Sequence, residues 1–380
     1  MSKDESILKA FLAFLKAGIW VDFVKYNDED LELMESIDWQ EVYEIADEQS
    51  VLGLVLTGIE KSPFKPHQDL LLQWIGEIQV IEQQNKMMNA FIEELLDRLR
   101  KADVYTLLVK GQGIAQCYDM PLWRTSGDVD LLLSEDNYSK AKELLLPLAT
   151  SAEDEIKVKK HLAMTIDGWS VELHGSLKDG LWNGIDKVIG NVQNAVFYEG
   201  KVRSWMNGNT QVFIPAPDED VVFVFSHILQ HFYKEGIGLR QICDWCRLLW
   251  TYRDSLNHRL LKSRLQKAGI MTEWKAFGAL AVDYLGMPVE SIPFYSPDKK
   301  WSLKSKKILG YVLETGNFGH NRDYSYQSKY PYIVYKTISF YRHLKDGVFF
   351  FSIFPVNSIK VTWRRMLVGF SVAIKGKRHE

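Results

Sequence analysis

The chain has 380 residues, enough for two or three domains at roughly 100–200 residues each. With 46% hydrophobic residues, 25% charged residues and no low-complexity tract, its composition excludes a disordered or fibrous protein. The net charge of −3 gives no reason to expect bulk nucleic-acid binding, and three cysteines are too few for a disulfide framework.

Residues 5 to about 100 are predicted to be helical throughout. Apolar residues recur at i, i+3 and i+4 spacing in SILKAFLAFLKAGI, in IDWQEVYEIADEQSVLGLVLTGIEK and over residues 72–101. The last of these segments ends in LDRLRKA, whose basic residues suit the C-terminus of a helix. We therefore predict a helical N-terminal domain over residues 1–94.

The pattern then changes to alternating strands and helices. VYTLLVKG (104–111) is a β-branched and aliphatic run stopped by glycine, and DVDLLLS (128–134) is a second apolar run, so both indicate strands. The other predicted elements are a short helix GIAQCYDM ended by Pro121, a helix EDNYSKAKELLLPL, strands IKVKKH, MTIDG and SVELHG (170–175), and a last strand TQVFIP (210–215). These elements predict an α/β core with a mixed sheet over residues 95–215.

Helical patterning dominates the chain after residue 215. PAPDEDVVFVFSHILQHF opens a helix with proline and acidic residues at its start, and after Gly236 and Gly238 the pattern resumes from Leu239 to about residue 315. We predict a mostly helical C-terminal domain over 216–380. The fold class is therefore α+β, with a mixed-sheet core flanked by N-terminal and C-terminal helical domains.

Asp128 and Asp130 are the candidate catalytic residues. Residues i and i+2 of a strand point to the same face, so the two carboxylates lie side by side. Like charges this close repel, and a divalent cation relieves the repulsion. Glu172, in the alternating strand SVELHG, can supply a third acid from a neighbouring strand. Three carboxylates predict a site for Mg²⁺ or Mn²⁺, with substrate phosphates as further ligands. An Asp-x-Asp motif alone is short and common, so its context matters.

Candidate phosphate ligands precede the two aspartates. Lys110-Gly111-Gln112-Gly113 closes one predicted strand and opens a helix, where backbone N–H groups can bind phosphate. An ordinary tight turn is the alternative. Arg124 lies four residues before Asp128 and is either a further phosphate ligand or part of a structural salt bridge.

These motifs resemble the polymerase-beta-like nucleotidyltransferase superfamily. The stretch LLVKGQGIAQCYDMPLWRTSGDVDLLL is similar to a bacterial family described as uncharacterised nucleotidyltransferases, and the similarity extends through VELHGSL and FSHILQHFYKEGIGLRQICDW, over about 90–250. The resemblance implies transfer of a nucleotidyl group from an NTP, with ATP expected, to an unknown acceptor, with release of pyrophosphate. It implies Asp128, Asp130 and Glu172 as metal ligands, Glu172 as the candidate general base, and Gly111 as the phosphate-binding glycine.

The glycine turn departs from the superfamily, which usually has Gly-Gly or Gly-Ser where this chain has Gly111-Gln112. The gap from this turn to the first aspartate is also longer than usual. The alternative function is therefore a catalytically weak module that uses the same fold to bind a nucleotide or a partner.

Two histidines and two cysteines allow two interpretations. His227 and His231, with Cys243 and Cys246, have zinc-like spacing within each pair, but both cysteines fall inside an apolar helix where buried cysteines are ordinary. The favoured interpretation follows the resemblance: His227, His231, Arg240 and Asp244 form a polar cluster, with an Arg240–Asp244 pair at i, i+4. This cluster either contacts the nucleotide or braces the helical domain. His161 and His174 flank the later strands; lining the cleft is one interpretation, and a structural role is the default.

The chain ends differ in charge. Residues 1–60 hold four Lys and fourteen Asp/Glu, whereas residues 301–380 hold fourteen Lys/Arg and four Asp/Glu. Mutual complementation or solvated faces is the favoured explanation, and a basic C-terminal surface for lipid headgroups or RNA is the alternative. The acidic start and the short apolar stretch 347–356 predict a soluble, cytoplasmic protein with, at most, peripheral membrane contact.

Overall fold

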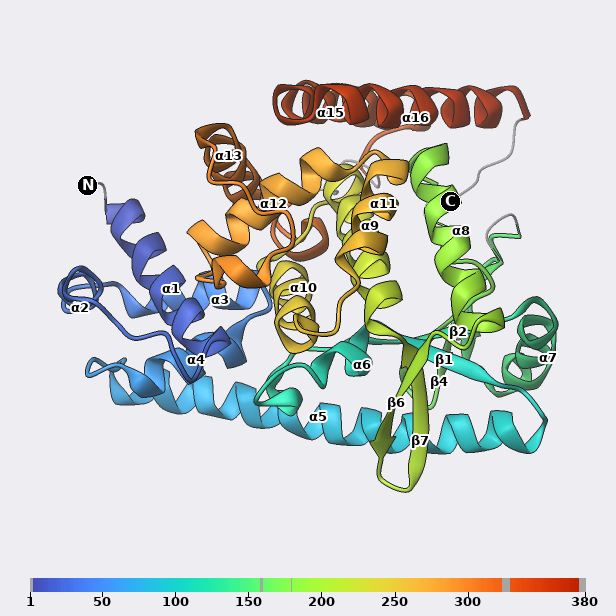
Figure 1. Ribbon diagram of the computed structural model, residues 1–380, viewed down its shortest axis with the longest axis horizontal. Helices are drawn as coiled ribbons and strands as arrows, with labels where there is room; N and C mark the ends of the chain where they lie inside the picture. Colours follow the sequence, from blue (N-terminus) through green and yellow to red (C-terminus); the bar gives the residue numbers. More distant parts are fainter. Residues whose placement is uncertain (1–2, 158–159, 179, 323–328, 376–380) are drawn as a thin grey trace.

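A computed structural model describes residues 3–157, 160–178, 180–322 and 329–375 (Figure 1). Its central sheet has five strands in the order β1-β2-β5-β4-β3. Only the β2–β5 pair is parallel, so the sheet is mixed, as predicted. The strands are β1 (Thr106–Val109), β2 (Asp128–Leu133), β3 (Ser151–Ala152), β4 (His161–Ile166) and β5 (Trp169–His174). β1 and β2 are mostly buried, which explains the aliphatic runs 107–109 and 131–133 within them.

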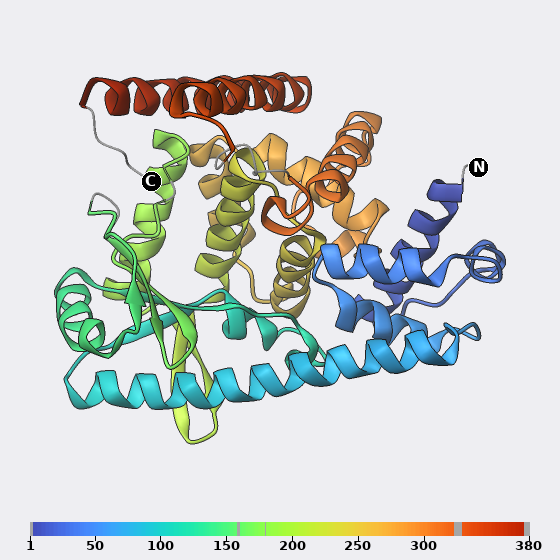
Figure 2. The ribbon, with the colours of Figure 1, turned by 180° about the vertical axis from the view of Figure 1, so that it is seen from behind.

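The N-terminal part is helical, as predicted. Its helices are α1 (Lys3–Ile19), α2 (Asp28–Met34), α3 (Trp39–Glu48), α4 (Leu52–Lys61) and α5 (Gln68–Lys101). Gly18 and Gly58 let α1 and α4 touch, because a Cβ at Gly18 would lie 1.7 Å from the Leu54 carbonyl oxygen. The 34-residue α5 runs beneath both these helices and the sheet, as the rear view in Figure 2 shows.

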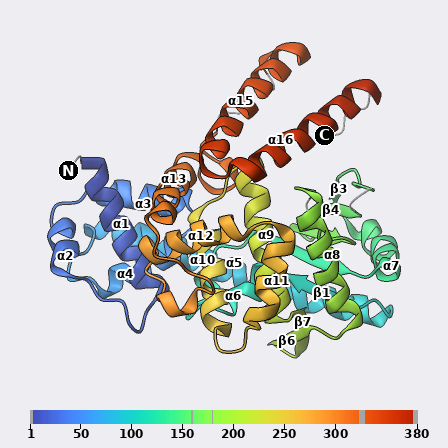
Figure 3. The same cartoon turned by 45° about the horizontal axis from the view of Figure 1, so that its top comes forward.

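Helices also dominate the rest of the chain. They are α6 (Gly111–Ala115), α7 (Glu135–Leu145), α8 (Asn183–Tyr198), α9 (Pro217–Lys234), α10 (Leu239–Tyr252), α11 (His258–Ala268), α12 (Met271–Asp283), α13 (Lys299–Thr315), α15 (Tyr332–Ile353) and α16 (Pro355–Lys375). Pro217 and three acidic residues open α9, as the sequence indicated. α15 and α16 form a two-helix arm that projects from the body (Figure 3).

Two strand predictions need correction. The segment 156–161 is not a strand: Ile156 makes an isolated bridge to His161, where β4 begins, and residues 158–159 lie outside the described residues. The strand at 210–215 exists as β7 (Thr210–Pro215), but it pairs with β6 (Val202–Asn207) in a separate two-stranded sheet. Sequence reasoning missed β6 because VRSWMN is largely exposed and has no apolar run.

The predicted domain boundaries fall within continuous structure. α5 crosses residue 94 without interruption. One cluster of buried side chains joins all three predicted domains, with members that include Phe14, Trp74, Leu132, Phe225, Trp274 and Phe354. These observations do not divide the chain into separate domains, and the boundaries at 94/95 and 215/216 stay predictions.

The C-terminal arm exposes apolar side chains, among them Tyr341, Val348, Phe351, Ile359 and Trp363. Even so, within the described part of the chain no helix has the length and apolarity needed to cross a bilayer. The basic end at 376–380 lies outside the described residues, so contact of this region with lipid or RNA stays a prediction.

Candidate active site

One face of the central sheet carries the three acidic residues predicted from the sequence. Asp130 of β2 lies directly opposite Glu172 of β5, and Asp128 precedes Asp130 by two residues on the same face. The same alternation brings two histidines to this face, since His174 follows Glu172 by two residues and lies opposite His161 of β4. Strand register thus assembles five potential ligands from three adjacent strands.

Asp130 is the buried centre of this group, with 1% of its surface exposed. Its Oδ1 lies 2.9 Å from Lys110 Nζ and 2.6 Å from His174 Nε2. Burial opposes the charge on both partners, but attraction to Asp130 and its neighbouring carboxylates outweighs it, so the pKa values of Lys110 and His174 are raised. The carboxylate is therefore held in place by two cationic groups.

Asp128 and Glu172 have opposite electrostatic environments. Repulsion from Asp130, with burial, raises the pKa of Asp128. Burial also acts to raise the pKa of Glu172, but hydrogen bonds from His161 (3.0 Å) and His174 (3.3 Å) outweigh it and lower that pKa. Glu172 is consequently an ionised acceptor, whereas Asp128 gains most from a cation bound nearby.

The donor chemistry fits a divalent metal. Oxygens of Asp128, Asp130 and Glu172 lie within 4.8 Å of one another, and carboxylate oxygens are the ligands that Mg²⁺ and Mn²⁺ prefer. Repulsion between Asp128 and Asp130 is what such an ion would relieve.

The turn after β1 places Lys110 beside these carboxylates. Lys110 has φ +59° and Gly111 has φ +43°, a region that side chains other than glycine occupy at a cost of about 1–3 kcal/mol. Gln112, predicted as a nucleotide ligand, turns its side chain away: its Nε2 donates to Asn85 of α5 at 2.7 Å. Any phosphate contact by Gln112 therefore falls to its backbone.

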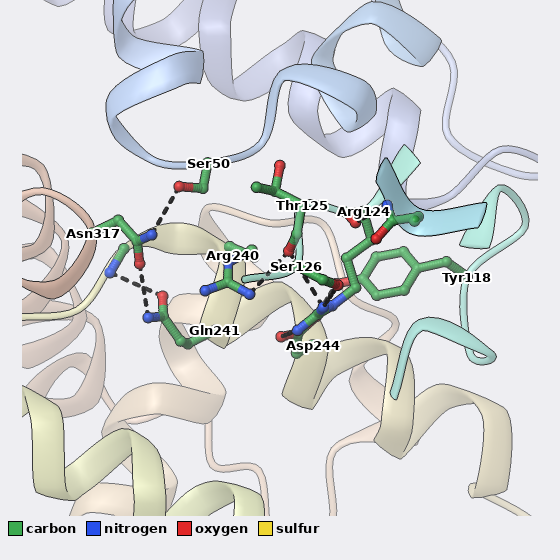
Figure 4. Close-up of polar contacts among 11 residues, drawn as sticks. Ser50, Tyr118, Arg124, Thr125, Ser126, Arg240, Gln241, Asp244 and Asn317 are labelled. Atoms are coloured by element: carbon green, nitrogen blue, oxygen red, sulfur yellow. Dashed lines mark hydrogen bonds and ion pairs between the residues drawn. The ribbon is translucent and has the colours of Figure 1, made fainter. Parts of the chain in front are cut away.

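Arg124 holds the loop before β2. Its Nε and Nη2 donate to the two carboxylate oxygens of Asp244 in α10, at 2.8 and 2.7 Å, and Nη1 donates to Ser126 at 2.7 Å (Figure 4). The Tyr118 hydroxyl donates to the same carboxylate at 2.8 Å. These contacts favour the structural of the two roles considered for Arg124, and a phosphate contact stays a prediction.

The chain matches the family model described as uncharacterised nucleotidyltransferase over residues 35–286. It belongs to this family. No curated protein and no solved structure matches the chain. The matched region spans the sheet with its three acids, together with α9 and α10. The chain is thus a nucleotidyltransferase, and its α+β fold suits that assignment.

In this nucleotidyltransferase, Arg240 does not form the pair predicted from its i, i+4 spacing to Asp244. Asp244 forms its ion pair with Arg124, and Arg240 Nη1 instead donates to the Thr125 carbonyl at 3.1 Å. The Nε of Arg240 is buried and has no hydrogen-bond partner among the described residues. Burial and the nearby charge of Arg124 lower the Arg240 pKa, which means that they disfavour its positive charge. An anion bound beside Arg240 would compensate that charge.

The four residues of the alternative zinc interpretation do not form a metal-ligand group among the described residues. His227 and His231 contact each other, with 3.1 Å between their Nε2 atoms, and Cys243 and Cys246 are buried free thiols. None of the groups of potential metal ligands found among the described residues contains these four. His231 and Arg240 each lie against the ring of Phe318, and these three residues with His227 form a cluster without Asp244, which pairs with Arg124. A role of this cluster in nucleotide binding stays a prediction.

Phe318 completes this cluster and was missed by sequence reasoning. It lies in the turn η4 (Asn317–Gly319), is 43% exposed and has φ +50°. Its ring contacts His231 edge to face at 4.9 Å and lies 5.9 Å from the Arg240 guanidinium. Asn317 anchors the turn through Gln241 and Ser50 (Figure 4). The glycines at 316 and 319 were the sequence feature that indicated a turn at this position.

Proposed function

We propose that this nucleotidyltransferase moves a nucleotidyl group from an NTP, with ATP as the expected donor, to an acceptor hydroxyl and releases pyrophosphate. Asp128, Asp130 and Glu172 hold the divalent ions, Mg²⁺ or Mn²⁺. The observation that carries the proposal is the convergence of these three carboxylates on one sheet face. When bound, the ions would supply charge neutralisation for the triphosphate and polarise the reacting phosphoryl group.

The cationic residues around the carboxylates bind the triphosphate. Lys110 Nζ contacts Asp130 directly, so a phosphate beside the metal ligands would also lie within its reach. Arg240 keeps one buried N–H without a partner among the described residues, which suits an anionic oxygen. The lowered pKa of Glu172 makes it a better metal ligand than general base, which modifies the role implied by the family resemblance.

Phe318 supports the nucleobase. It is an exposed aromatic ring in a strained conformation, and strained residues concentrate at functional sites. Stacking on an aromatic ring stabilises any base, so this contact gives affinity without selecting among the four. His227 and His231 line the same side of the cluster. The acceptor, and any role of nucleic acid or a membrane surface in presenting it, stays open to test.

The test is calorimetric titration of ATP, GTP, CTP and UTP, each with Mg²⁺ or Mn²⁺. Wild type is compared with Asp128→Asn/Asp130→Asn and with the control Asp136→Asn, which changes an exposed acid on α7. We expect metal-dependent binding in wild type and control, weakened by roughly 100-fold or more in the double variant, since two charged ligands are lost. Folded wild-type protein that binds no NTP would overturn the proposal.

A further inference from the structure

His161 and His174 are adjacent to the three carboxylates and belong to a ligand group of their own. They lie opposite each other on β4 and β5, with ring centroids 4.9 Å apart. Both direct Nε2 at the same Glu172 oxygen, at 3.0 and 3.3 Å. The residue opposite Glu172 on β4 is Ala163, whose small side chain lies between His161 and Thr165 on that strand.

These separations match those between ligands of one metal ion. Imidazole nitrogens and carboxylate oxygens bind Zn²⁺ at about 2.0–2.2 Å, which places neighbouring ligand atoms about 3–3.5 Å apart. The two nitrogen-to-oxygen distances at Glu172 lie in that range. His161, His174 and Glu172 are between 15% and 26% exposed, so an ion can reach them from solvent.

We propose that His161, His174 and Glu172 form a second metal site, which takes a transition-type divalent ion such as Zn²⁺, Co²⁺ or Mn²⁺. Imidazole is a ligand for these ions, whereas Mg²⁺ prefers oxygen donors, so the two sites differ in selectivity. Glu172 belongs to both ligand groups, so this inference rests on the proposed function, in which Glu172 is a metal ligand. It adds a mixed-ligand metal centre at which the ion need not be magnesium.

Metal binding requires His161 and His174 to release to solvent the Nε2 protons that they direct at Glu172, and it requires one exchange of partners. His174 Nε2 lies 2.6 Å from Asp130, and it must leave that oxygen to bind an ion. Asp130 then keeps Lys110, whose Nζ lies 2.9 Å from the same oxygen. Since the buried carboxylate retains a cationic partner, the exchange leaves no unpaired charge at Asp130.

The test uses untagged full-length protein and Co²⁺ as the probe, because its visible absorption reports the ligands directly. In the absence of nucleotide we expect one Co²⁺ ion per chain, competed by Zn²⁺ and not by equal Mg²⁺. His161→Gln and His174→Gln should each weaken Co²⁺ binding by roughly 100-fold. Loss of a residue that only supports a metal ligand costs about 10–100-fold, and loss of the ligand itself should cost at least as much. The control His258→Gln changes an exposed histidine and should leave binding unchanged.

A second measurement needs no variant. Pulsed EPR of Mn²⁺ bound to wild type, with excess Mg²⁺ present to compete at the carboxylate site, should show nitrogen coupling from imidazole, and its absence would overturn the inference. Unchanged Co²⁺ affinity in both histidine variants would do so as well. Either result leaves the proposed function standing if Mg²⁺–NTP binding persists. Conversely, Co²⁺ binding by folded wild-type protein that binds no NTP would support this site and overturn the proposed function.

Discussion

Phe318 shows how a single residue can adopt an unfavourable backbone conformation and still be well anchored. Its φ of +50° lies in a region that glycine adopts easily and phenylalanine does not. Hydrogen bonds from the adjacent Asn317 to Ser50 and from Gln241 to Asn317 fix the turn in this conformation. Those partners come from α10 and from the connection between α3 and α4. Such strain persists only where the surroundings determine the conformation, so the exposed ring has a fixed position.

Phe318→Ala is predicted to weaken NTP binding in the presence of Mg²⁺ by about 10-fold, since base–aromatic stacking contributes about 1–3 kcal/mol. Phe318→Tyr should bind as wild type. Phe318→Gly separates stacking from strain, because glycine accepts the positive φ: it should lose the same affinity while unfolding at equal or higher urea concentration than Phe318→Ala. Calorimetry and urea unfolding measure both effects. Equal NTP affinity in Phe318→Ala and wild type would contradict stacking of the nucleobase on Phe318.

At the scale of the element, α10 fixes the loop that leads into β2. Asp244 binds Arg124, and Arg240 donates to Thr125 two residues before Gly127, so both contacts lie just upstream of Asp128. Arg124 and Asp244 are almost fully buried, at 6% and 4% exposure. Loss of one partner would leave a buried charge without compensation.

Asp244→Asn is therefore predicted to destabilise the protein by about 3–5 kcal/mol, measured by urea unfolding. The double variant Arg124→Met/Asp244→Leu should recover a large part of that loss, because it removes both charges and keeps apolar volume. If the double variant were less stable than Asp244→Asn, the buried ion pair would not be the source of the effect.

The histidines of α9 give a pH dependence with a defined sign. Burial, with the positive charge of Lys110 and the neighbouring His231, lowers the pKa of His227 well below its ordinary value of 6.5. Below pH 6.5 the unfolded chain binds a proton that folded His227 does not, so stability falls as the pH decreases, by up to about 1.4 kcal/mol per pH unit. His227→Gln should reduce this acid sensitivity between pH 6.5 and 5 in urea unfolding. His258→Gln is the control, and equal slopes in all three proteins would contradict the prediction.

The sequence was informative where local periodicity determines position. Alternation within β2 and β5 was enough to predict Asp128, Asp130 and Glu172 on strands, and the structure places them on one face. The histidine pair at Glu172 depends on the register between β4 and β5, which no local pattern encodes. The Arg240–Asp244 prediction was wrong because helix spacing ignored Arg124, which approaches Asp244 from a distant loop. Phe318 depends on contacts with α10 that also bridge a long sequence separation.

At the scale of the whole molecule, one cluster of buried side chains joins the helices to the sheet, and a second packs the sheet against α5 and α7. The first cluster extends from α1 through the sheet to α12, α13 and the junction of α15 with α16. The long helix α5 runs without interruption beneath the N-terminal helices and the sheet (Figure 2). α5, β1 and β2 contribute side chains to both clusters, so the strand that carries Asp128 and Asp130 links the two.

We accordingly predict a single cooperative transition in calorimetric heating, with the calorimetric enthalpy equal to the van't Hoff enthalpy. Three independent domains at 1–94, 95–215 and 216–380 would instead give separable transitions. The control is Leu303→Ala, which changes an exposed side chain on α13 and should shift the transition by little. Two or more resolved transitions in wild type would favour the domain boundaries predicted from the sequence.

The spread of the site along the chain also bears on synthesis. The ribosome makes the carboxylates and histidines of β2, β4 and β5 first, then α9 and α10, and Phe318 only after α13. A nascent chain would therefore gain its metal ligands well before the turn that supports the base. Because the ligands converge only in a folded sheet that is packed against later helices, ion binding and nucleotide binding should both appear only when nearly the whole core has been translated.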